Sequence, residues 1–197
     1  MTWVKVCGLS QPAEVEAAVV AGADAVGFVF YEPSPRNITP DRARALGQTA
    51  GVLTVAVTVD LDADSLLHIA DLAGVGAVQP HGANAAQAAS AAIEAGLAVL
   101  RPVTVAGPVD LTVVPGDELP LLDSGSIGGT GTAFDWSWLG NLDRPFVLAG
   151  GLGPDNVADA VERFAPWGVD ASSGLESAPG VKDLSKVTAF VNRAKGT

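Results

Sequence analysis

The chain has 197 residues, of which 48% are hydrophobic, and its 11 Lys and Arg against 22 Asp and Glu give a formal net charge of −11. This length and apolar content predict one large domain over residues 1–197 with a substantial buried core. The negative charge argues against nucleic-acid and membrane-surface partners, the single cysteine excludes an intrachain disulfide, and the lack of a signal-peptide pattern or a membrane-spanning apolar run predicts a cytoplasmic protein.

In chain order, short runs of β-forming residues alternate with alanine-rich stretches of helical period. The expected strands are 3–8, 25–30, 52–59, 77–81, 97–103, 119–124, 146–151 and 168–174. The expected helices are 11–23, one that opens at Pro40, 62–74, 84–96, the short 134–140, 153–164 and 181–194. We expect Ser10 to be the N-cap of the first helix and Gly22 to end it. Residues 106–118 carry Pro and Gly without helical period, so the helix after the fifth strand should be missing or reduced.

Eight strands, nearly all followed by helices, predict a (β/α)₈ barrel around a parallel sheet. Such barrels commonly use about 250 residues, so this one should be trimmed in its loops and in its fifth helix. The competing architecture is an open doubly wound sheet. Its dinucleotide-binding form expects G-x-G-x-x-G after the first strand, whereas this chain has "CGLSQP" there.

Glycine-rich turns follow three of the late strands, at 128–131, 150–153 and 172–174. Glycine lets backbone N–H groups approach a ligand closely, and the loops after the last two strands of such barrels commonly hold a phosphate. The alternative is that these glycines only make tight turns. Three such turns on one face favour a phosphate site, with the expected ligands Gly129, Thr130, Gly131, Gly150, Gly151, Ser172, Ser173 and Gly174.

Two residues at strand ends are candidates for acid–base chemistry. Cys7 ends the first strand, where a thiol with an ordinary pKa of about 8.5 can act as a base once partly ionised; the alternative is a small buried apolar residue. Asp123 ends the sixth strand and becomes a candidate acid if burial raises its pKa. A carboxylate that only caps the following loop is the alternative for Asp123.

Polar residues near other strand ends are candidates for substrate binding. Arg36 lies in the Pro-flanked stretch "PSPRN", which would hold a guanidinium for bidentate capture of a carboxylate; otherwise it is a solvated loop cation. His81 follows Pro80 and either bonds a ligand or satisfies loop carbonyls. Arg101 lies in the fifth strand, and Asp170 ends the eighth.

At these residues the sequence resembles the phosphoribosylanthranilate isomerases, barrel enzymes of tryptophan biosynthesis, almost from end to end. It departs from the family pattern at Pro80, where a leucine is usual, and in a longer loop after Asp123. The segments that carry the resemblance are "VKVCGLS", "AGADAVGFVFYEPSPRNITPDRA", "VQPHG", "LLDS" with "GGTGTAFDWSWL", "FVLAGGLGPDNVADAV" and "GVDASSGLESAPGVKDLSKVTAFV".

The resemblance implies an Amadori rearrangement of N-(5-phosphoribosyl)anthranilate, without a metal or organic cofactor. It assigns Asp123 as the general acid that opens the furanose ring and Cys7 as the general base at C2. It places Arg36 on the anthranilate carboxylate, Asp170 on a sugar hydroxyl, and the phosphate on the glycine-rich turns. It also implies a monomer or a homodimer.

Two other functions stay open at this point. The sister isomerase of histidine biosynthesis, or a bifunctional form, performs the same rearrangement on a bulkier substrate. Those enzymes use Asp at the position of Cys7, so the thiol favours the single-substrate isomerase. A barrel that only binds a sugar phosphate or a partner protein should have lost at least one of Cys7, Arg36 and Asp123, and all three are present.

Overall fold

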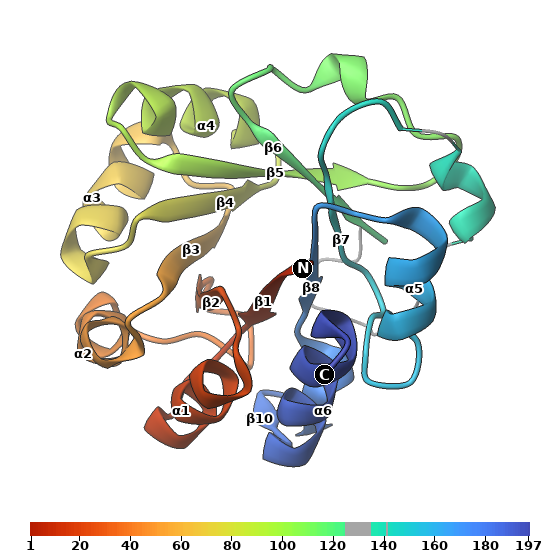
Figure 1. Ribbon diagram of the computed structural model, residues 1–197. Coiled ribbons are helices and arrows are strands. Elements are labelled where there is room, and N and C mark those ends of the chain that lie inside the picture. The colour runs from red at the N-terminus through yellow and green to blue at the C-terminus, as the bar shows by residue number, and fades with distance from the viewer. Residues whose placement is uncertain (125–134, 141) are drawn as a thin grey trace.

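The computed structural model describes residues 1–124, 135–140 and 142–197. Eight parallel strands follow one another in chain order around a closed barrel, with the helices outside it (Figure 1). The strands are β1 Trp3–Cys7, β2 Ala25–Phe30, β3 Leu53–Val59, β4 Ala77–His81, β5 Ala98–Thr104, β6 Leu119–Asp123, β7 Val147–Leu148 and β8 Gly168–Ala171. The expected barrel is therefore confirmed, and the open sheet is excluded.

The helices lie close to the positions that the sequence predicts. They are α1 Pro12–Ala21, α2 Pro40–Ala50, α3 Ala63–Ala73, α4 Ala85–Glu94, α5 Val157–Phe164 and α6 Leu184–Lys195, with 3₁₀ turns η1 Leu111–Val113, η2 Trp136–Leu139 and η3 Ser173–Leu175. Only η1 lies between β5 and β6, which confirms the reduced fifth helix. None of the described helices is both long enough and apolar enough to cross a membrane.

The start of α1 differs from the prediction. Gln11 is the N-cap, and the expected Ser10 lies one residue before it. The reason is Glu14, whose Oε2 accepts hydrogen bonds from the backbone N–H groups of both Ser10 and Gln11 at 2.7 and 3.0 Å. Because an acidic side chain in the first turn satisfies these donors, a serine cap is not needed. Gly22 ends the helix at φ 98°, as expected.

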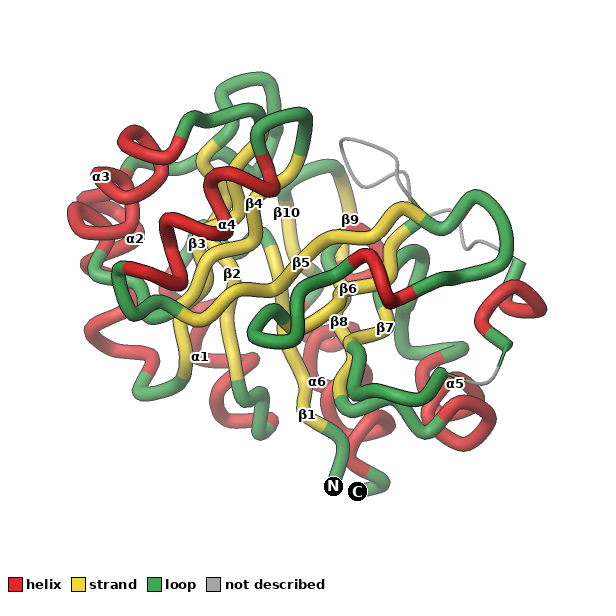
Figure 2. Tube along the Cα trace, turned by 90° about the horizontal axis from the view of Figure 1, so that it is seen from above, coloured by secondary structure: helices red, strands yellow, loops and turns green. Residues whose placement is uncertain are grey.

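The sequence does not predict the two-stranded hairpin that lies between β8 and α6. This hairpin pairs β9 Glu176–Ala178 with β10 Val181–Lys182 in antiparallel register. Each strand is too short to show an alternating pattern, and only Pro179 and Gly180 indicate the turn. Figure 2 shows the hairpin toward the opposite end of the barrel from the two chain termini.

Side chains along each strand point alternately to the helices and into the barrel, as a period of two requires. The outward residues form the large core beneath the helices, including Val4, Val6 and Phe28. The inward residues near the strand starts, such as Val55 and Leu121, form an apolar floor. Inward residues near the strand ends include Cys7, Val29 and Val57, and these surround the mouth of the barrel.

Candidate active site

A cavity of about 320 Å³ opens at the carboxyl ends of the strands. It brings together six residues that the sequence analysis selected, from five different segments of the chain. They are Cys7, Arg36, His81, Asp123, Asp170 and Ser172. Tyr31, Gln79 and the apolar side chains of Val29 and Val57 complete the wall. Arg101 lies elsewhere, because its guanidinium faces outward and bonds the Ala85 carbonyl oxygen at 3.0 Å.

Two glycines make room around Cys7, which is 5% exposed at the end of β1. A Cβ at Gly27, on the adjacent strand, would lie 2.8 Å from the Cys7 sulfur. Gly8 has φ 73°, and a Cβ there would lie 2.6 Å from Cδ of Arg36 and 2.9 Å from the hydroxyl of Ser172. The glycine behind the cysteine therefore supplies a left-handed turn and lets two cavity residues approach the backbone.

Lys5, two residues before Cys7, is fully buried inside the barrel. Its ammonium donates hydrogen bonds to Oδ2 of Asp170 at 3.0 Å and to Oε1 of Gln79 at 2.9 Å. The other carboxylate oxygen of Asp170, Oδ1, is buried and accepts no hydrogen bond from the described residues. A buried carboxylate oxygen of this kind on a cavity wall is suited to accept a hydrogen bond from a ligand.

These buried groups shift one another's pKa values. Burial raises the pKa of the Cys7 thiol, the Lys5 ammonium opposes that shift, and the Asp170 carboxylate adds to it. Burial also raises the pKa of Asp170, against the opposing effect of Lys5. Burial alone would lower the pKa of Lys5, but the negative charge of Asp170 keeps it above its ordinary value. The three groups therefore have to be considered as one electrostatic unit.

His81 is neutral at physiological pH in this cavity. Burial and the charge of Lys5 lower its pKa to about 4. Its Nε2 lies 3.0 Å from Nε2 of Gln79. Because Oε1 of Gln79 accepts from Lys5, the amide nitrogen is the donor to the ring, and the ring proton is placed on Nδ1. His81 can therefore donate a hydrogen bond to a ligand through Nδ1.

Arg36 is buried and makes a bidentate ion pair with Glu176 of the hairpin. Its Nε and Nη2 donate to the two carboxylate oxygens at 2.7 and 2.8 Å. Lys182, on the second hairpin strand, donates to Oε1 of the same carboxylate at 2.8 Å and to the backbone oxygen of Ser172 at 3.0 Å. Burial alone would raise the pKa of Glu176, but the hydrogen bonds from both cations hold it below its ordinary value. The guanidinium is thus fixed by protein contacts and is not a solvated loop cation.

Asp123 ends β6 and is partly exposed in the cavity. The hydroxyl of Ser124 donates to its Oδ1 at 3.3 Å. Gly150, at the end of the next strand, has φ 76°, and a Cβ there would lie 2.6 Å from the backbone nitrogen of Ser124 and 3.1 Å from Oδ1 of Asp123. Gly150 therefore lets the turn after β7 pack against the end of β6.

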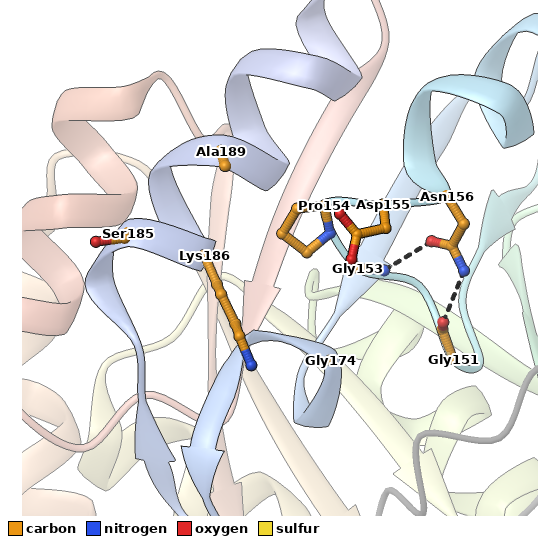
Figure 3. A pocket seen from close by; sticks show the side chains of 9 residues that line it. All are labelled: Gly151, Gly153, Pro154, Asp155, Asn156, Gly174, Ser185, Lys186 and Ala189. Carbon is orange, nitrogen blue, oxygen red and sulfur yellow. Dashed lines mark hydrogen bonds between the residues drawn. The ribbon is translucent and has the colours of Figure 1, made fainter.

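The turns after β7 and β8 also pack directly on each other. A Cβ at Gly174 would lie 2.1 Å from the backbone oxygen of Leu152. The Asn156 side chain orders the first turn by bonding the nitrogen of Gly153 and the oxygen of Gly151 (Figure 3). Of the predicted phosphate ligands, Gly150, Gly151, Ser172, Ser173 and Gly174 lie in these adjoining turns, and Gly129, Thr130 and Gly131 lie outside the described residues.

A second hollow, of about 500 Å³, lies on the far side of these turns, between them and α6. Gly151, Gly153 and Gly174 line it together with Lys186 (Figure 3). The Lys186 ammonium donates a hydrogen bond to the backbone oxygen of Glu176 at 2.8 Å. It shares no lining residue with the cavity around Cys7. As for metal ions, the described residues contain no cluster of three or more His, Cys, Asp and Glu side chains that could hold one.

Sequence reasoning missed Lys5, Gln79, Glu176 and Lys182. Lys5 and Gln79 could have been found, because each lies two residues before a predicted site residue on the same strand and so points to the same side of the sheet. Glu176 and Lys182 gave no such signal, because they belong to the hairpin that the sequence did not reveal.

Comparisons with known proteins point to one family. Residues 4–193 match the model of the N-(5'-phosphoribosyl)anthranilate isomerase family. The isomerase of Rubrobacter xylanophilus is 42% identical over 205 residues, which cover 99% of this chain and all of that protein. The crystal structure of the Thermus thermophilus isomerase superposes with a TM-score of 0.90 at 31% identity over 99% of each chain.

Two further crystal structures are each 35% identical to this chain and superpose over the full length of both chains with a TM-score of 0.87. One shows monomers generated from the dimeric isomerase of Thermotoga maritima. The other shows a phosphoribosylanthranilate isomerase in complex with reduced 1-(o-carboxyphenylamino)-1-deoxyribulose 5-phosphate.

Proposed function

The chain belongs to the N-(5'-phosphoribosyl)anthranilate isomerase family, and from this premise we propose how its own residues divide the work of the reaction. The enzyme converts N-(5-phosphoribosyl)anthranilate to 1-(2-carboxyphenylamino)-1-deoxyribulose 5-phosphate in tryptophan biosynthesis. The observation that carries the assignment of roles is that Cys7 and Asp123 reach one cavity from different strands, together with the fixed guanidinium of Arg36.

Asp123 acts first, as the general acid. Its carboxylic acid gives a proton to the furanose ring oxygen while the bond from that oxygen to C1 breaks. The lone pair of the anthranilate nitrogen forms a double bond to C1, so the ring opens to a protonated Schiff base. The position of Asp123 on the cavity wall supports this role, because a general acid has to lie within hydrogen-bond reach of the bound sugar.

Cys7 acts second, as the general base. Its thiolate takes the proton from C2, the electrons of that bond form the C1–C2 double bond, and the imine electrons return to nitrogen. The resulting enolamine then tautomerises to the C2 ketone. Because this sequence needs proton transfer at carbon and no covalent adduct, the thiol serves as a base and not as a nucleophile. The imine is itself the electron sink.

The remaining contacts hold the two ends of the substrate. Arg36 binds the anthranilate carboxylate, and its fixed position in the ion pair with Glu176 supports this role, because a guanidinium that is already ordered loses less entropy on binding. The buried Oδ1 of Asp170, which accepts no hydrogen bond within the described part of the chain, accepts from a sugar hydroxyl, and neutral His81 donates from Nδ1. The phosphate lies on backbone N–H groups of the turns after β7 and β8, as adjoining glycine turns allow.

The experiment replaces each proton-transfer group by a near-isosteric residue that cannot perform its step. Cys7→Ser leaves almost no anion near neutral pH, and Asp123→Asn has no transferable proton. We expect each variant to fold normally and to bind a product analogue, but to lose at least about 100-fold in kcat, the lower range for a positioned acid or base.

The matched control is Asp117→Asn, which makes the same change at an exposed loop carboxylate and should turn over like the parent enzyme. Alkylation of the single thiol should also inactivate the parent, more slowly when the product analogue is bound. Turnover of Cys7→Ser within a few-fold of the parent would show that the thiol only packs.

A further inference from the structure

Lys5 has no part in the mechanism above, yet it is among the largest side chains with no exposed surface in the described part of the chain. Removing an ammonium from water is costly unless the charge is paired and hydrogen-bonded. A neutral residue could fill the same space on the barrel floor. The position of the Lys5 ammonium relative to the Cys7 thiol suggests a role for this buried positive charge.

Lys5 and Cys7 project into the barrel from the same side of β1, one above the other. Gly27 on β2 contacts both side chains, since a Cβ there would lie 2.8 Å from the Cys7 sulfur and 3.2 Å from Cε of Lys5. The aliphatic part of the Lys5 side chain and the Cys7 thiol therefore both lie next to Gly27 of β2. Hydrogen bonds to Asp170 and Gln79 prevent the ammonium from turning away from this position.

The two other cations near the thiol, Lys182 and Arg36, both pair with the carboxylate of Glu176. Lys182 donates to Glu176 and to Ser172, and Arg36 shares the same Glu176. The charges that act on the thiol are Lys5 from β1, Asp170 from β8 and Lys182 from β10. The other titratable groups on the cavity wall are Arg36, His81, Asp123 and Tyr31.

We propose that Lys5 is a positioning residue for Cys7: its ammonium, held in place by Asp170 and Gln79, stabilises the negative charge that the sulfur carries when the thiol ionises. Asp170 has two opposing effects in this arrangement, because it orients the ammonium and also repels the thiolate. The catalytic meaning of the coupling rests on the proposed role of Cys7 as the base. The coupling itself is a property of the free enzyme.

The pKa shifts agree in sign with this arrangement. Burial raises the pKa of Cys7, and Lys5 is the strongest influence that lowers it, whereas Asp170 raises it. Removing Lys5 and removing Asp170 should therefore move the ionisation of the thiol in opposite directions. If Lys5 only filled space and paired with Asp170, removing Lys5 and removing Asp170 would not shift the pKa of Cys7 in opposite directions.

The test is the pH titration of thiolate absorbance in the free enzyme, which reports one group because the chain has a single cysteine. Cys7→Ser provides the blank. In Lys5→Met the midpoint should rise by at least about one pH unit, and in Asp170→Asn it should fall, since a neighbouring charge typically shifts a pKa by about one to three units. The rate of alkylation by iodoacetamide should follow the same order.

The double variant Lys5→Met/Asp170→Asn leaves neither charge unpaired, so it keeps the test valid if Lys5→Met alone unfolds. Its midpoint should lie between those of the two single variants and above that of the parent. The matched control is Lys195→Met, which breaks the 2.6 Å ion pair between Lys195 and Asp24. Neither residue is among the charges that act on the thiol, so this variant should titrate like the parent.

An unchanged midpoint in Lys5→Met and in the double variant, or shifts of the same sign in both single variants, would overturn the proposal. The outcome is separable from that of the proposed function. If the midpoints move as expected while Cys7→Ser keeps its turnover, the coupling holds and the assignment of Cys7 as the base fails. If Cys7→Ser is inactive and the midpoints do not move, the base stands and Lys5 is excluded as its positioning residue.

Discussion

At the scale of single residues, the proposed role of Arg36 depends on a protein contact that orders its guanidinium before a ligand binds. An arginine on a mobile loop would lose side-chain entropy when it captured a carboxylate. Here Glu176 already orders the guanidinium through Nε and Nη2, and Lys182 offsets the negative charge of that carboxylate. In the proposed role of Arg36, the substrate carboxylate would therefore bind a guanidinium that does not have to be ordered again.

Replacing Arg36 should consequently impair binding more than chemistry. We expect Arg36→Met to raise KM by about 10- to 100-fold, the range for losing a hydrogen bond between charged groups, with a much smaller change in kcat. Arg36→Lys keeps the charge but cannot pair with Glu176 through two parallel hydrogen bonds, so it should lie between the parent and Arg36→Met. Steady-state kinetics over a range of substrate concentrations distinguish the two parameters. A collapse of kcat at constant KM would assign Arg36 another role.

Some site residues could be predicted from local sequence patterns, and others could not. Cys7, His81 and Asp123 end strands whose patterns are readable, and the active face of a barrel follows from strand direction alone. Glu176 was not predictable, because its role is to order Arg36, which is 140 residues away in the chain. Pairing between a loop and a hairpin is a tertiary contact that no local pattern encodes.

At the scale of elements, the β9–β10 hairpin is a support for the loop that carries Arg36. Gly180 in its turn has φ 80°, and a Cβ there would lie 2.4 Å from the backbone oxygen of Pro35. The Gly180 nitrogen also donates to Oε2 of Glu176 at 3.2 Å. The turn thus contacts both the residue before Arg36 and the carboxylate that orders it.

Gly180→Ala should therefore disturb the substrate site from outside it. The added methyl group has to push the hairpin away from Pro35, and we expect KM to rise several-fold while kcat changes little. Gly51→Ala is the matched control, because Gly51 has a similar φ of 66° but no heavy atom within 4 Å of the added Cβ. Both variants should lose about 1 kcal/mol of stability through the left-handed backbone, measured by urea unfolding. Equal KM values in the two variants would rule out the supporting role.

Most element positions could be predicted from the sequence, since apolar periodicity and glycine or proline stops mark them directly. The start of α5 shows the limit of such signals. Pro154 suggested a helix from residue 153, but the helix begins at Val157, because the intervening residues form the turn that Asn156 closes by bonding Gly151 and Gly153. A non-helical turn closed by an asparagine side chain and a first helical turn have similar local sequences.

At the scale of the whole molecule, buried titratable groups link the site to stability. His81 has a pKa of about 4 in the folded state against an ordinary value of 6.5. Between these two values the unfolded chain binds the proton and the folded chain does not, so folding becomes less favourable as the pH falls. The raised pKa of Asp170 acts in the opposite direction, and the lowered pKa of Glu176 removes further stability at more acid pH.

Because these contributions overlap in pH, the stability curve of the parent does not isolate the contribution of His81. Comparison with a histidine variant does. We expect the free energy of unfolding of the parent to fall between about pH 6.5 and pH 4, with at most about 3 kcal/mol due to His81. His81→Gln should remove that part and flatten the curve within this window. His68→Gln alters the only other histidine, which is exposed on α3, and should leave the curve unchanged. Urea unfolding at closely spaced pH values provides the measurement. A parent and a His81→Gln variant with parallel curves would show that the pKa of His81 is the same in the folded and the unfolded protein, and would contradict the lowered pKa of the buried ring.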